Sequence, residues 1–146
     1  MVVVLIHLAI SAVWLGSMVY SLAVVQPRVE HFFPDLERRE EFLLALADGN
    51  RRPVLALVGA LLLTDLAVLV LRPDMRLGYG LALLPYGLAT AVFAHVTWRH
   101  WPARVFALPG ELPGYQRRLR GLAWTMLALV GAAFLATLSV SLMSSK

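Results

Sequence analysis

Cysteine is absent from the 146 residues, and lysine occurs once, at position 146. Without cysteine the chain can have no disulfide, no thiolate metal ligand and no cysteine nucleophile. Charged residues are also scarce, at 15% of the sequence, against roughly a quarter in soluble domains. The sequence contains no phosphate-binding glycine loop, no HExxH and no GxSxG, so the common nucleotide-binding, zinc-protease and hydrolase motifs are excluded.

Apolar residues are abundant, at 60% of the sequence, and the mean hydropathy is +0.74. They gather in four stretches, and each stretch reaches the roughly 20 residues with which an α-helix crosses about 30 Å of hydrocarbon. The pattern predicts an all-α protein, an integral membrane up-and-down four-helix bundle that forms a single domain over residues 1–146. The first stretch has no basic segment before it, so we expect a retained span rather than a signal peptide. The four stretches cover residues 2–25, 53–71, 77–101 and 119–143.

The connections carry helix and turn signals of their own. FPDLERREEFLLALADG begins with Pro-Asp and reaches Gly49, which predicts a short surface helix that stops at this glycine. RPDMRLGYG predicts a tight turn between the second and third spans. The segment 102–116 contains three prolines and two glycines, so we expect an irregular loop there.

Arginine is distributed unevenly between the two sides of the expected bundle. Basic residues concentrate on the cytoplasmic side of short membrane loops, and ten arginines lie in the two longer connections, against Arg72, Arg76 and Lys146 on the other side. Both termini are therefore predicted to face outward. The net charge of +4 follows from this asymmetry, so we expect the lipid bilayer, and no nucleic acid, as the partner. The ten are Arg28, Arg38, Arg39, Arg51, Arg52, Arg99, Arg104, Arg117, Arg118 and Arg120.

The preference for arginine also bears on the source of the chain. Twelve of the thirteen basic residues are arginine, which is typical of a GC-rich prokaryotic genome. Together with the four spans, this predicts a multi-pass protein of the bacterial inner (plasma) membrane.

Several polar side chains are expected at one depth in the bundle. His7 lies six residues inside the first span, and Asp65 lies seven residues before Arg72 at the end of the second. A helix rises about 1.5 Å per residue, so both lie roughly 10 Å below the outer surface. Ionisable groups at such depth usually face the bundle interior with a partner, and we expect the carboxylate to accept from imidazole, tyrosine or serine. Other members of this layer are Tyr79, Tyr86, Thr137, Ser139 and Ser141.

Three interpretations of this layer remain open at the level of sequence. It can be a satisfied polar core that fixes helix register. His7 can instead be a metal or haem ligand that Asp65 orients, because a ligating imidazole commonly donates its other N–H to a carboxylate. A proton relay is the third interpretation. The methionines add a copper hypothesis: Met75 and Met143 are expected near the outer ends of their helices, and thioether with imidazole suits Cu(I). The candidate metal ligands are therefore His7, Met75 and Met143.

The opposite side carries HVTWRHW at the end of the third span. Trp98, Arg99 and His100 fit an aromatic and basic belt at the lipid headgroups, and His95 is the one residue expected to turn inward. His7 and His95 lie about 15 Å or more apart along the membrane normal, so one haem cannot take both as axial ligands. The candidate cofactor-binding residues are His7, Asp65, Tyr86 and His95, for copper or haem b.

The segment HLAISAVWLGSMVYSLAVVQPRV resembles the first helix of small bacterial membrane families around copper-resistance protein D. The matching residues are a histidine, Trp-x-Gly and a proline beyond the helix, here His7, Trp14, Gly16 and Pro27. FPDLERREEF and YQRRLRGLAW are similar to four-helix relatives as well. Their last helix often opens with Leu-His-Gly, where this chain has Arg120 as the middle residue. The resemblance implies a membrane metal-handling protein that binds copper, or haem, at His7.

The same helix also resembles that of the HemJ type of protoporphyrinogen oxidase, which shares the histidine, the tryptophan, the glycine and a Pro-Arg pair, here Pro27 and Arg28. That family also has a lysine within the bundle, whereas the only lysine here is Lys146. This resemblance implies a haem-dependent membrane redox enzyme. A third possibility is an accessory structural subunit, either in a homo-oligomer or in a larger membrane complex.

Overall fold

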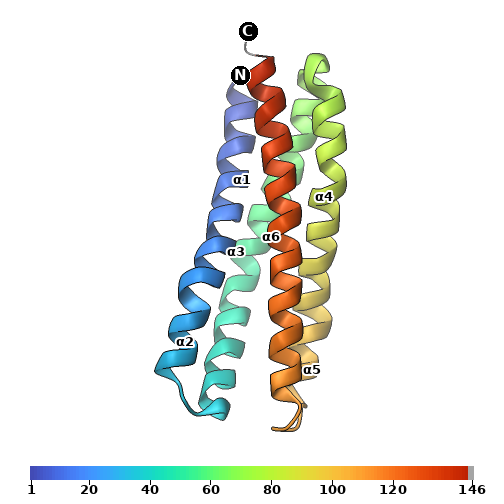
Figure 1. Cartoon of the computed structure of the whole chain (residues 1–146). Coiled ribbons are helices and arrows are strands. Elements are labelled where there is room, and N and C mark those ends of the chain that lie inside the picture. The colour runs from blue at the N-terminus through green and yellow to red at the C-terminus, as the bar shows by residue number, and fades with distance from the viewer. Residues whose placement is uncertain (145–146) are drawn as a thin grey trace.

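The computed structural model describes residues 1–144 and consists of four long, nearly parallel helical rods (Figure 1). All four are long and apolar enough to cross a membrane, and the described residues contain no strand. The predicted all-α four-helix bundle is confirmed. The start of the first rod and the end of the last lie at one end of the bundle, here called the terminal end (Figure 1). The elements are α1 (Val2–Tyr20), η1 (Ser21–Val25), α2 (Gln26–Phe32), α3 (Leu36–Leu71), η2 (Pro73–Met75), α4 (Arg76–His95), η3 (Val96–His100), α5 (Trp101–Val105) and α6 (Leu112–Met143).

The second rod is a single helix, α3, of 36 residues. Its start agrees with the sequence, since the Asp35 side chain caps it by accepting from the backbone N–H of Glu37 at 3.3 Å. The predicted stop at Gly49 is wrong, because the helix runs through Gly49 and Pro53 to Leu71. No described glycine has a positive φ, so Gly49 does not end the helix. Proline 53 removes only the hydrogen bond to the carbonyl four residues earlier, and the rest of the ladder continues.

The predicted loop over 102–116 is also wrong in extent. The third rod continues from α4 through a π-helical turn into α5, which ends at Val105. Pro113 lies in the first turn of α6, where the missing proline N–H has no intrahelical partner to lose, whereas Pro102 follows the π-helical turn directly and the rod continues through it. The irregular stretch is therefore confined to residues 106–111. The turn expected after α3 is confirmed as η2, where Arg72 pairs with Asp74 at 2.8 Å.

The interior is stratified along the bundle axis. The buried stripe of α1 recurs every three or four residues, as one face of a helix requires, and includes Val4, His7, Ser11, Trp14 and Met18. Val4 belongs to an apolar cluster near the terminal end, with Val68, Met75 and Tyr79. Trp14 and Met18 belong to a second, larger cluster that includes Leu61, Tyr86, Val130 and Ala133. His7 and Ser11 thus lie between two apolar clusters.

Candidate functional site

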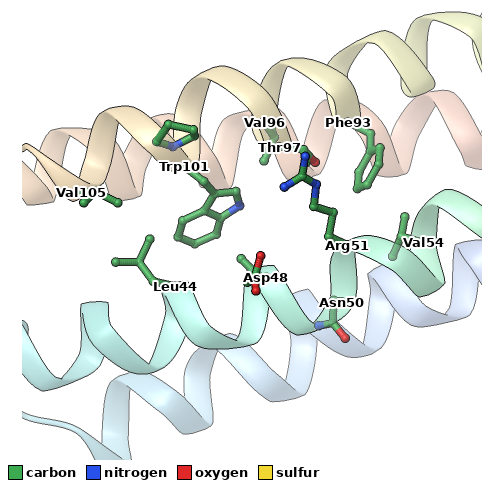
Figure 2. Close-up of a pocket in the computed structure, with 12 residues that line it drawn as sticks. Leu44, Asp48, Asn50, Arg51, Val54, Phe93, Val96, Thr97, Trp101 and Val105 are labelled. Atoms are coloured by element: carbon green, nitrogen blue, oxygen red, sulfur yellow. The ribbon is translucent and has the colours of Figure 1, made fainter.

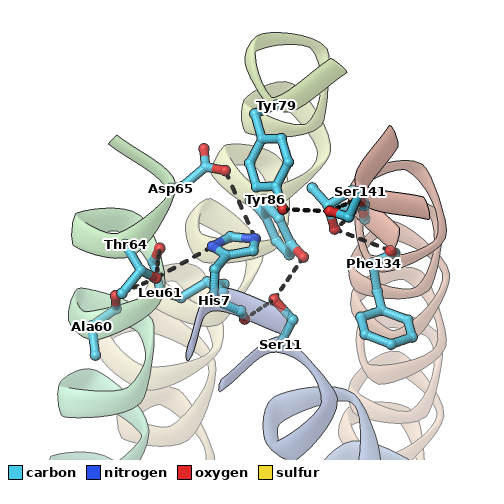
Figure 3. A network of polar contacts seen from close by, with 12 residues as sticks. His7, Ser11, Ala60, Leu61, Thr64, Asp65, Tyr79, Tyr86, Phe134 and Ser141 are labelled. Carbon is cyan, nitrogen blue, oxygen red and sulfur yellow. Dashed lines mark hydrogen bonds and ion pairs between the residues drawn. The ribbon is translucent and has the colours of Figure 1, made fainter. Parts of the chain in front are cut away.

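The site lies where α1 and α3 face each other below the terminal end (Figure 3). His7 on α1 and Asp65 on α3 are both fully buried, and Nε2 of the imidazole lies 3.8 Å from Oδ1 of the carboxylate. The prediction that these residues share one layer inside the bundle is confirmed. Both belong to helices that are long and apolar enough to cross a membrane, so two ionisable groups meet where burial of charge is expensive.

The orientation of the imidazole is fixed by Thr64, which precedes Asp65 on α3. The Thr64 hydroxyl lies 2.9 Å from the carbonyl oxygens of Ala60 and Leu61 and 3.2 Å from Nδ1 of His7. A hydroxyl has one hydrogen, and a carbonyl only accepts. The hydroxyl therefore donates to the backbone and accepts from Nδ1–H. In the neutral ring this places the lone pair on Nε2, the nitrogen that faces Asp65.

Asp65 does not receive the hydrogen bonds expected from the sequence. Across residues 1–144, neither carboxylate oxygen of Asp65 nor Nε2 of His7 has a hydrogen-bond partner. The tyrosines bind elsewhere: Tyr86 donates to Ser11 at 3.0 Å, and the hydroxyl of Tyr79 pairs with that of Ser141 at 2.9 Å. Buried polar atoms without partners are rare and costly. Nε2 of His7 and Oδ1 of Asp65 therefore face each other across 3.8 Å with no hydrogen bond to either atom.

Aromatic rings enclose the imidazole on its other sides. The ring centroids of Tyr79 and Tyr86 lie 5.1 and 5.8 Å from that of His7. Trp14 stacks on Tyr86 at 6.5 Å and begins the larger apolar cluster. The polar layer is therefore separated from the far end of the bundle by the larger cluster, and from the terminal end by the smaller one.

Of the other candidate site residues from the sequence, some lie near His7 in the structure and others do not. Tyr86 belongs to the layer, and Met75 is buried in the adjoining apolar cluster beside Tyr79. Met143 is 76% exposed and His95 is exposed on α4, so neither joins His7. The expected roles of the two histidines in HVTWRHW, His95 and His100, are reversed. His100, expected at the surface, is buried against Tyr115 with ring centroids 5.6 Å apart.

Sequence reasoning missed two groups of residues. Ser11 follows His7 by one helical turn and accepts from Tyr86, and this i, i+4 spacing was a usable signal. At the far end, Arg104 donates to Glu40, which also accepts from Gln116 at 2.8 Å. These three residues lie on α5, α3 and α6, and no motif in the sequence connects them.

Comparison of the chain with protein-family models, curated proteins and solved structures finds no match. Within the part of the chain that the structure describes, no three His, Cys, Asp or Glu side chains are grouped so that they could hold a metal ion. The interpretation of the site therefore depends on its own geometry.

Proposed function

We propose that this chain is a multi-pass membrane protein that takes up one proton at the pair His7–Asp65. The observation that carries the proposal is the set of three buried atoms without partners among residues 1–144, Nε2 of His7 and both oxygens of Asp65. A neutral imidazole and an ionised carboxylate present only lone pairs to each other. One proton on either group replaces that repulsion with an attractive hydrogen bond or ion pair.

The arrangement limits where the proton binds. Thr64 occupies Nδ1, so exchange takes place at Nε2 or on the carboxylate. The Nε2–Oδ1 separation of 3.8 Å exceeds a hydrogen bond of about 2.7–3.2 Å, so one water or a small side-chain rotation completes the pair. The pair then exists either as imidazolium with carboxylate or as imidazole with carboxylic acid.

The apolar clusters favour exchange from one side of the membrane. The larger cluster contains Trp14, Leu61 and Val130, and such side chains offer no hydrogen-bonded route to the far end. Only the smaller cluster separates the pair from the terminal end. We propose that the terminal end faces outward across the bacterial plasma membrane, because the arginine-rich connections favour the cytoplasmic side for the far end. Proton uptake would then occur from outside.

A metal ion is the second proposal, favoured by the same three free donor atoms. An imidazole nitrogen and a carboxylate oxygen bind Zn²⁺ at about 2.0–2.2 Å, so a separation of 3.8 Å accommodates one ion in a bent arrangement. These two side chains would hold the ion and leave its remaining positions to other ligands. Copper is suggested by the resemblance to the copper-resistance protein D families, but Met143 is exposed and the softer donors do not gather at His7.

Haem does not fit this layer. A histidine that ligates haem needs space for the flat porphyrin ring in front of its free nitrogen. Here Asp65 faces Nε2 at 3.8 Å and two tyrosine rings pack against the imidazole, so that space is occupied. We therefore propose no haem-dependent step, and the oxidase alternative rests only on its resemblance.

The proton proposal is tested by infrared difference spectroscopy of the purified protein in lipid nanodiscs over a pH series. The wild type is expected to show a carboxylic-acid C=O band that titrates, and Asp65→Asn is expected to abolish it. Asp48→Asn is the matched control, because Asp48 lies on the same helix at the far end and is not in the layer. Circular dichroism establishes that each variant keeps its helices.

Three outcomes separate the proposals. Proton binding at this pair is overturned if Asp65→Asn leaves the pH-dependent carboxylic-acid bands of the wild type unchanged and the imidazole bands of His7 do not change with pH. Stoichiometric Zn²⁺ or Cu²⁺ in the wild type after dialysis, lost in His7→Ala, establishes the metal site instead. A layer that binds neither proton nor metal is a structural polar core, as an accessory subunit would have.

A further inference from the structure

A buried arginine lies at the far end of the bundle, away from His7. Arg104 on α5 is 3% exposed and donates through Nη2 to both carboxylate oxygens of Glu40 on α3. Its guanidinium carbon stacks over the Trp101 ring at 4.7 Å. The Glu40 carboxylate is held in turn by Gln116. The arginine is therefore held by Glu40 on α3 and Trp101 on its own helix, and Gln116 on α6 supports the glutamate.

This arginine has donors left over. Its Nε and Nη1 are buried and have no hydrogen-bond partner anywhere in residues 1–144. The side chain lines a cavity of about 130 Å³ with Arg39, Arg120 and Gln26. Glu30 is the one acidic residue in this lining, and it pairs with Arg120 at 2.6 Å. The three arginines Arg39, Arg104 and Arg120 outnumber the two carboxylates Glu30 and Glu40, so one positive charge remains at this cavity. The two unpaired donors of Arg104 also require an acceptor.

A larger cavity of about 520 Å³ adjoins the first on the side of α3 that faces α4 and α5 (Figure 2). Its volume lies within the roughly 300–1,000 Å³ of small-molecule sites. Ala47, Asn50 and Trp101 line both cavities, so the two cavities are neighbours across these side chains. The Arg51 guanidinium stands over Trp98 at 5.3 Å and lines the larger cavity. The apolar lining consists of Leu44, Val54, Phe93, Val96, Pro102 and Val105.

We propose that the two cavities together bind one membrane lipid with an anionic phosphate headgroup. The phosphate accepts from Nε and Nη1 of Arg104, and an acyl chain lies along the apolar cavity toward Phe93 and Val54. Phosphate matches the planar fork of a guanidinium. A lipid is favoured over a free anion because the charged cavity adjoins the apolar one at the tryptophan-bearing end of a membrane helix, the level at which headgroups meet acyl chains.

Native mass spectrometry of the full chain, released from nanodiscs of phosphatidylcholine with and without phosphatidylglycerol, tests the proposal. The wild type is expected to retain phosphatidylglycerol preferentially. Arg104→Lys keeps the charge opposite Glu40 but removes the fork, and a charge-assisted hydrogen bond of about 1.5 kcal/mol or more corresponds to at least tenfold weaker retention. Arg118→Lys is the matched control, because Arg118 is exposed and lines neither cavity.

A second variant covers the case in which Arg104→Lys fails to fold. Ala47→Phe fills the boundary between the cavities without changing any charge, and it is expected to lose the lipid as well. Retention that is the same in Arg104→Lys and Arg118→Lys overturns the proposal, because equal losses would indicate general surface electrostatics and equal retention would show that Arg104 does not hold the headgroup. Displacement of the lipid by inorganic phosphate alone at comparable concentration overturns it too, since the site would then recognise a free anion. Retention that Ala47→Phe leaves unchanged excludes these cavities.

Discussion

Gly78 marks a tight contact between two rods of the bundle, where α4 meets α6 near the terminal end. A Cβ added at Gly78 would overlap one methyl group of Val140 and lie 3.0 and 3.1 Å from its other methyl carbon and its Cβ. Val140 packs against the cluster of Val4, Met75 and Tyr79. Because valine is β-branched and has one strongly preferred rotamer in a helix, the methyl group cannot simply rotate away. Gly78→Ala must therefore push α4 and α6 apart or distort Val140.

Overpacking of this kind costs about 1–3 kcal/mol. Unfolding of the purified protein by sodium dodecyl sulfate, followed by tryptophan fluorescence, is expected to show a free energy of unfolding lower by this amount in Gly78→Ala than in a glycine-to-alanine variant without the clash. Gly87→Ala on the same helix is the control, because a Cβ there meets nothing within 4 Å. That variant is expected to change stability by no more than about 1 kcal/mol, the intrinsic difference between glycine and alanine in a helix.

The clash predicts a specific rescue. Val140→Ala alone removes buried methyl groups and is destabilising, but combined with Gly78→Ala it supplies the missing space. The double variant is expected to be more stable than the sum of the two single effects by about 0.5–3 kcal/mol. If Gly78→Ala is as stable as Gly87→Ala, or the two changes are additive, the close approach of α4 and α6 described here is wrong.

Two further variants test the polar contacts. Thr64→Val removes the acceptor of His7 Nδ1–H and is expected to lower the free energy of unfolding by about 0.6 kcal/mol, the average for hydrogen bonds within membranes. Nitrogen-15 NMR of the imidazole should then show a mixture of the two tautomers in place of the single Nδ1–H form. Glu40→Ala leaves Arg104 as an uncompensated buried charge and is expected to cost about 3–5 kcal/mol, whereas Glu30→Ala breaks a half-exposed pair and should cost at most about 1 kcal/mol in the same unfolding titration.

The number and order of the membrane helices could be predicted because each apolar stretch is long enough to span the bilayer on its own. Helix ends were less predictable. Gly49 and the proline at 53 are helix-ending signals in soluble proteins, but α3 passes through both. Pro102 and Pro113 predict a loop, but Pro102 lies within the continuous third rod and Pro113 begins α6. Proline is compatible both with a loop and with a helical turn, and packing against the neighbouring helices determines which of the two forms.

The meeting of His7 and Asp65 could be predicted because depth in a membrane helix follows from residue count. Hydrogen-bond partners could not, since they depend on rotation of each helix about its axis. Asp65 faces the imidazole rather than a tyrosine hydroxyl, and Thr64 takes the supporting role expected of Asp65. The contact of Glu40 with Arg104 joins residues 64 positions apart, and neither lies in a recognisable motif.

The continuity of α3 through Pro53 sets the height of the molecule. Its 36 residues rise about 54 Å at 1.5 Å per residue, whereas the hydrocarbon core is about 30 Å thick. If the hairpin at Arg72 and Asp74 lies at one membrane surface, most of the surplus length of α3 extends beyond the hydrocarbon at the opposite end. There α3 is already helical from Leu36, so the chain continues past Gly49 and Pro53 as preformed helix.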